Sequence, residues 1–157
     1  MRYATILGVA VLAGIGAAVA VAQRPAPAPA AGQPTVEVYK SPTCGCCSKW
    51  VDHLRASGFT VRTTDTDQVD PIKNQHGVPM TLRSCHTAVV DGYVLEGHVP
   101  AADVQRLLKE RPAVAGLAVG GMPVGSPGME VPGRPADPYD VMAFDKAGVT
   151  SVFSRHR

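Results

Sequence analysis

Alternating apolar and polar residues predict two strands at the start of the folded part of the chain. In "TVEVYK" (35–40), Val36 and Val38 alternate with polar neighbours, which is typical of a strand with one buried face. The stretch "FTVRTTD" (59–65) alternates in the same way and is rich in β-branched residues. We therefore expect the folded part to begin near Thr35.

Three other stretches have the apolar spacing and the boundaries of helices. In 46–57 the apolar residues fall on one helical face, and Gly58 follows as a residue type that commonly ends helices. The stretch 70–77 predicts a short helix with a proline near its first turn. In 100–111 an apolar stripe follows an initial proline, and Pro112 ends the helix.

Two hairpins are predicted in the second half. "TAVV" and "YVLEG" flank Asp91-Gly92, a dipeptide typical of two-residue hairpin turns. "YDVMAFD" and "VTSVFSR" flank residues 146–148 and predict a terminal hairpin. Before that hairpin, residues 119–138 are dominated by Gly and Pro, which indicates a long irregular loop of the kind that often has a function.

The predicted element order indicates a fold. Over residues 35–111 the order is β-α-β-α-β-β-α, which is the order of thioredoxins. The CxxC formed by Cys44 and Cys47 falls where that fold carries its own. We therefore predict an α/β, thioredoxin-like metal-binding domain over 35–112. Residues 113–157 would form a C-terminal extension, a loop and a hairpin, packed on the same domain.

The N-terminus predicts export. Arg2 precedes the uncharged apolar stretch 4–22, and residues 20–22 form a small-x-small cleavage site. Residues 1–22 are therefore expected to be a signal peptide, with a retained membrane anchor as the alternative. The Pro/Ala-rich stretch 23–34 predicts an extended linker. Both alternatives place the folded part outside the cytoplasm, in the periplasm, and membrane contact is expected only if the anchor is retained.

Charge gives no sign of a nucleic-acid partner. The chain has 15 Lys and Arg against 13 Asp and Glu, and no run of basic residues stands out.

The stretch "SPTCGCCSKW" places three of the four cysteines within four positions. In an exported protein, four cysteines commonly form two structural disulfides. A bond between Cys46 and Cys47 would close a strained ring, and one between Cys44 and Cys46 is little better. Only Cys44 with Cys47, or one of the three with Cys85, gives a relaxed disulfide. At least one thiol of the triplet is therefore unsuited to a purely structural role.

A redox pair and a metal site remain. At a helix N-terminus, unpaired N–H groups and the helix dipole stabilise thiolates, which suits thiol–disulfide exchange by Cys44 and Cys47. Cys46 would compete in every mixed disulfide, which disfavours a simple oxidoreductase. Clustered thiolates are soft ligands that favour Cu(I) or Zn(II), and bridging sulfurs can hold more than one Cu(I).

The fold prediction brings further ligands to the triplet. The first strand ends, the third begins and the fourth ends at one edge of the sheet. Cys85 and His86 precede the third strand, and His98 follows the fourth, so all three are expected to face the triplet. Thioether sulfur also binds Cu(I), and Met122 and Met129 lie in a Gly/Pro-rich loop with little core to fill.

Other histidines and methionines favour ordinary roles. His53 has polar neighbours and is expected to be a solvated surface residue, and His156 lies in the tail. Met80 and Met142 are expected in the core.

Three motifs together carry a family resemblance. "SPTCGCCSKW", "LRSCHTAVVDGYVLEGHVPAADVQRLL" and "GMPVGSPGME" resemble the small exported copper-resistance proteins of the CopG family, from about residue 35 to the C-terminus. The resemblance implies a thioredoxin-like fold, a periplasmic location and copper bound through cysteine. On the matching positions it implies Cys44, Cys46, Cys47 and Cys85, and His98 and the Met-bearing loop also match.

The hypothesis is therefore an exported copper-binding protein that holds Cu(I), as a thiolate-bridged cluster, through the four cysteines. His98 and His86 would lie in or next to the ligand set. The expected partners are copper ions and other periplasmic copper-handling proteins. Because thiolate and Cu(I) both give up electrons, a copper oxidoreductase activity is compatible with the site. The alternatives are a periplasmic thiol–disulfide oxidoreductase or isomerase, and a zinc-stabilised module.

Overall fold

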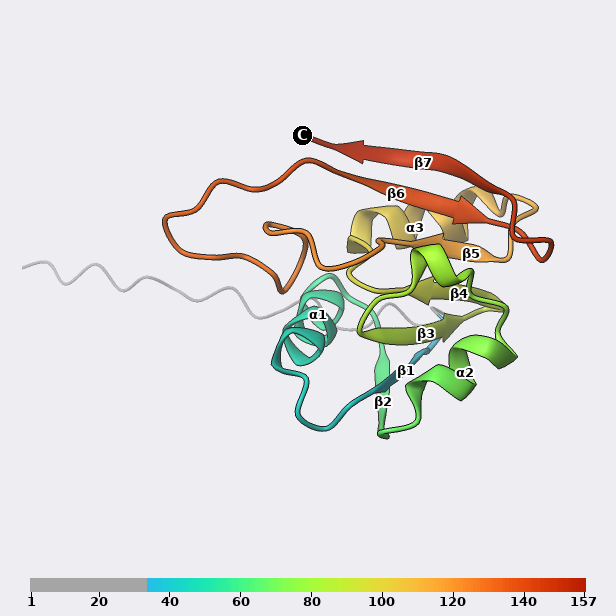
Figure 1. Cartoon of the computed structure of the whole chain (residues 1–157), viewed down its shortest axis with the longest axis horizontal. Helices are drawn as coiled ribbons and strands as arrows, with labels where there is room; N and C mark the ends of the chain where they lie inside the picture. Colours follow the sequence, from blue (N-terminus) through green and yellow to red (C-terminus); the bar gives the residue numbers. More distant parts are fainter. Residues whose placement is uncertain (1–33) are drawn as a thin grey trace, which may run out of the picture.

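A computed structural model describes residues 34–157, which form a seven-stranded sheet with three α-helices (Figure 1). The strand order is β2-β1-β3-β4-β5-β6-β7. In chain order the elements are β1 Val36–Lys40, α1 Gly45–Ala56, β2 Val61–Asp65, α2 Val69–Gln75, the 3-10 turn η1 Met80–Leu82, β3 His86–Val90, β4 Tyr93–Glu96, α3 Ala101–Glu110, β5 Gly116–Ala118, β6 Tyr139–Phe144 and β7 Thr150–His156.

The predicted mixed α/β class and element order are confirmed. β1 pairs in parallel with β2 and antiparallel with β3, as a β-α-β unit followed by a β-β-α unit requires. The turn between β3 and β4 has positive φ at Asp91 (49°) and Gly92 (84°), as expected for the two-residue hairpin. The assignment to the thioredoxin fold itself stays a prediction.

One strand was not predicted. β5 has three residues, too few to show an alternation, yet it pairs in parallel with β4 and antiparallel with β6. Through β5, the predicted hairpin β6–β7 continues the same sheet (Figure 1).

Helices lie on both faces of the sheet. The larger core packs α1 and α3 on one face, through buried side chains such as Trp50, Leu54 and Leu107. The indole Nε1 of Trp50 donates to the carbonyl of Val99 at 2.8 Å, which satisfies its polar group inside the core. A smaller cluster on the opposite face includes Val78, which follows α2.

Three strand ends meet at one edge of the sheet. Lys40, the last residue of β1, lies opposite His86, the first of β3, and Thr87 lies opposite Glu96, the last of β4. The N-terminus of α1 follows β1 closely, so its first turn belongs to the same edge.

The predicted signal peptide 1–22 and all but the last residue of the linker 23–34 lie outside the described residues. Among the helices of residues 34–157, none has the length and apolarity needed to cross a bilayer.

Candidate metal centre

The cysteine triplet forms the first turn of α1. Cys44 is the N-cap residue, and the amide of Ser48 donates to the Cys44 carbonyl at 3.2 Å. No side chain caps this end and no acidic residue lies in the first turn, so the helix N-terminus is left to the cysteine sulfurs.

Cys44 and Cys47 are joined by a disulfide, the one pairing within the triplet that the sequence favoured. Cys46 and Cys85 are free, half-buried thiols. The sulfurs of Cys44 and Cys46 are 3.5 Å apart. A four-thiolate site therefore exists only after the disulfide has been reduced.

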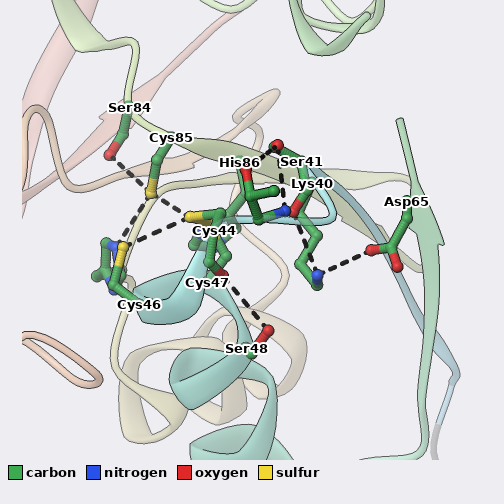
Figure 2. Close-up of a disulfide and its surroundings, with 12 residues drawn as sticks. Lys40, Ser41, Cys44, Cys46, Cys47, Ser48, Asp65, Ser84, Cys85 and His86 are labelled. Carbon is green, nitrogen blue, oxygen red and sulfur yellow. Dashed lines mark hydrogen bonds and ion pairs between the residues drawn. A yellow bond between two sulfur atoms is a disulfide. The ribbon is translucent and has the colours of Figure 1, made fainter. Parts of the chain in front are cut away.

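The structure brings Cys85 to the triplet. The sulfurs of all four cysteines lie within 4.8 Å of one another. Figure 2 shows Cys85 reaching from the start of β3 toward Cys44 and Cys46 at the start of α1. Two segments that lie about forty residues apart in the chain thus form one sulfur cluster.

Two histidines adjoin the Cys85 sulfur. It lies 3.1 Å from Nε2 of His98 and 3.4 Å from Nδ1 of His86. Nδ1–H of His98 donates to the carbonyl of Pro127 at 2.8 Å, which leaves the Nε2 lone pair facing the sulfur. Nε2 of His86 is buried and has no hydrogen-bond partner among residues 34–157.

Both imidazoles favour the neutral, metal-binding form. Burial lowers the pKa of His86 well below its usual value, and the neighbouring His98 and Lys73 lower it further. Burial also lowers the pKa of His98, although its hydrogen bond to Pro127 acts in the opposite direction.

Burial has the opposite consequence for the Cys85 thiol. It raises the pKa of Cys85 to about 11, and the nearby Cys46 raises it too. The thiol is therefore protonated at neutral pH, and a metal that binds there must displace a proton.

The loop 119–138 packs against both cysteine-bearing segments. Ser84, beside Cys85, donates through its hydroxyl to the carbonyl of Gly121. Gly128 lies so close to α1 that a Cβ there would be 2.8 Å from the Cys46 carbonyl oxygen. These contacts come from the loop backbone.

The predicted methionine ligands lie in the same loop. Met122 is exposed and Met129 is half-buried. Copper binding by either residue stays a prediction.

Three expectations about other residues were wrong. His53 is half-buried, and its Nε2 accepts a hydrogen bond from the Ala101 amide at 3.0 Å, so it caps α3. Met80 is 73% exposed rather than in the core, because it lies on η1 at the surface. His156 belongs to β7 and pairs with Asp103 at 2.8 Å, rather than lying in a tail.

Sequence reasoning missed a buried ion pair beside the site. Lys73 of α2 and Glu96 at the end of β4 are 4% and 0% exposed, and their charged atoms are 2.6 Å apart. The available signal was a charged residue directly after the apolar run "YVL". Its lysine partner could not be chosen from the sequence, because α2 carries it from a distant segment.

The comparisons with known proteins agree with the resemblance. The solved structure "Copper resistance protein copG- Form 2" matches with 43% identity and a TM-score of 0.76, over 80% of this chain and 100% of that chain. Form 1 of the same protein matches with 43% identity and a TM-score of 0.75, over 80% and 98%. A family model described as a protein of unknown function, DUF411, matches residues 82–129. No curated protein matches significantly.

Proposed function

Because this chain belongs to the family of the copper resistance protein CopG, we propose that it is an exported copper-binding protein of copper resistance. It holds Cu(I) through the thiolates of its four cysteines, as a thiolate-bridged cluster in the periplasm. The observation that carries the proposal is the convergence of the four sulfurs within 4.8 Å of one another.

The donor set fits Cu(I). Thiolates are soft ligands that favour monovalent copper, and the neutral imidazoles of His86 and His98 adjoin the Cys85 sulfur. The buried carboxylate closest to this segment, Glu96, is already paired with Lys73. The site therefore offers sulfur and nitrogen rather than the oxygen ligands that hard cations require.

Loading requires reduction of the Cys44–Cys47 disulfide. A dithiol reductant supplies two electrons and two protons, and its own sulfurs become a disulfide. Each thiol that then binds Cu(I) releases its proton to water. Copper capture is thus coupled to thiol oxidation state, and this coupling makes the site compatible with a copper oxidoreductase activity.

The residues beside the thiolates have subsidiary roles in this proposal. His98 directs Nε2 at the Cys85 sulfur and completes the ligand set, with His86 next to it. Met122 and Met129 capture Cu(I) from solution or from another periplasmic copper-handling protein.

The test is an anaerobic Cu(I) titration of the reduced protein against a chromophoric chelator. Wild-type protein should bind copper tightly, and Cys46→Ser should lower the amount bound, because it removes a bridging sulfur. Ser48→Ala, an exposed neighbour on the same turn, is the matched control and should bind like wild type. Equal binding by Cys46→Ser and wild type would contradict the cluster.

The second candidate function is thiol–disulfide exchange, which the Cys44–Cys47 disulfide at a helix N-terminus favours. It predicts insulin-reductase or isomerase activity that depends on Cys44 and Cys47 and survives loss of Cys46 and Cys85. Loss of that activity in Cys46→Ser, together with lost copper binding, would rule it out.

A further inference from the structure

One carboxylate holds both ends of the segment that carries Cys85. Oε1 of Glu96 accepts a hydrogen bond from the Ser84 amide at 2.7 Å, directly before Cys85. Oε2 of the same side chain accepts a hydrogen bond from the Thr87 hydroxyl at 2.6 Å, directly after His86. The two residues between these contacts are those whose side chains face the cysteine triplet.

The charge of this carboxylate is matched inside the protein. Lys73 donates to Oε1 of Glu96 at 2.6 Å and to the Thr87 hydroxyl at 3.0 Å. Every polar atom of this network is therefore paired, which is the condition under which a buried charged network becomes rigid. Glu96 itself is fully buried, so water does not compete for its contacts.

The backbone beside the network leaves little room for another arrangement. Gly97 has φ of +70°, and a Cβ at this position would lie 2.7 Å from Cβ of Ser84. The amide of Gly97 also donates to the His86 carbonyl at 3.0 Å. The end of β4 thus contacts the Cys85 segment through side chain and backbone together.

We propose that Glu96 is a positioning residue for the metal site: by holding both ends of the Cys85–His86 segment, it aims the Cys85 sulfur at the cysteine triplet. Lys73 supplies the charge that keeps the carboxylate ionised and buried. The consequence for copper rests on the proposed function, whereas the placement of the sulfur does not.

Two double variants separate the hydrogen bonds from the charge. Lys73→Met with Glu96→Leu removes the ion pair and both contacts to the Cys85 segment. Lys73→Met with Glu96→Gln removes the same charges but keeps a carbonyl oxygen for the Ser84 amide and an amide that can donate to the Thr87 hydroxyl. Apolar replacement of a whole buried pair is commonly tolerated, so both proteins are expected to fold.

The first measurement needs no metal. In a Cys44→Ser, Cys47→Ser background only Cys46 and Cys85 carry thiols, and dibromobimane fluoresces when it bridges two neighbouring thiols. The Leu double variant should bridge them at least about tenfold more slowly, since two hydrogen bonds are lost. The Gln double variant should stay within about threefold of the parent. Equal rates in all three proteins, or equal slowing in both variants, would overturn the proposal.

Thr87→Val removes one contact and keeps the ion pair, so it decides the matter if a double variant fails to fold. It should slow bridging about threefold. Asp103→Asn is the control, because it removes another buried carboxylate, one that pairs with His156 on β7. Its rate should equal that of the parent, and near-ultraviolet circular dichroism of Trp50 reports whether each variant is folded.

The second measurement connects the placement to copper. In the reduced four-cysteine protein, the Leu double variant should lower the Cu(I) affinity about tenfold, and in a Cys85→Ser background by less than about twofold. Equal losses in both backgrounds would indicate a general structural effect and overturn the positioning role. If wild-type protein binds no Cu(I), the proposed function fails, and the bridging rates still decide the role of Glu96.

Discussion

The two segments that supply the sulfurs are held by different means. The triplet lies on the first turn of α1, where helix geometry sets the spacing of Cys44, Cys46 and Cys47. Cys85 precedes β3, and its position depends on the pairing of β3 with β1 and on the buried Glu96. One half of the site is local, and the other is tertiary.

This difference indicates how each half should fail. The triplet keeps its spacing as long as α1 exists, because a single hydrogen-bonded turn defines it. The Cys85 half depends on residues from α2 and β4, so a distant substitution can displace it without changing any ligand. The site should therefore be most sensitive on the Cys85 side.

The largest expected effect breaks the tertiary half. Lys73→Met leaves Glu96 buried with an unpaired charge, which should lower the free energy of unfolding by about 3–5 kcal/mol. Lys40→Met is the matched control, because its partner Asp65 is 54% exposed and can return to water. That loss should be about 1 kcal/mol or less. Urea denaturation measures both, and equal losses would contradict the difference between the segments.

The second effect compares the two free thiols directly. Below its raised pKa of about 11, Cys85 is mainly a thiol, and each unit above the ordinary 9.0 reduces the thiolate tenfold. Alkylation of Cys85 in the oxidised protein should be about a hundredfold slower near pH 7 than that of an ordinary thiol. Its rate should rise about tenfold per pH unit up to about pH 11. Mass spectrometry of the two labelled peptides measures this, and a plateau near pH 9 would contradict it.

The smallest effect tests the local half through its loop contact. Gly128 has φ of +88°, and a Cβ there would approach the Cys46 carbonyl, so Gly128→Ala should cost about 1–3 kcal/mol. Gly133 has φ of +76° with open space around it, so Gly133→Ala should cost only the backbone strain, about 1 kcal/mol. Thermal unfolding compares the two variants. The same shift for both would mean that the loop does not press on the triplet.

The sequence predicted the local features and the site's edge well. The alternation in β1 and the stripe of α1 gave the β-α-β start, and Asp91-Gly92 gave the hairpin. Because strand ends at one edge follow from the element order, Cys85 could be expected near the triplet. The three residues of β5 were missed because three positions hold no readable period. His53 was misjudged because its partner, the Ala101 amide, comes from another helix.

By itself, the sequence determined the helix that carries the triplet, the soft chemistry of its ligands and the family to which the chain belongs. Only the tertiary structure decided how Cys85 is held: a carboxylate on β4, its lysine on α2 and the loop carbonyl that orients His98 meet around it. The physical reason is range. Helix spacing is a property of neighbouring residues, whereas the pairing of buried charges depends on which distant segments the fold brings into contact.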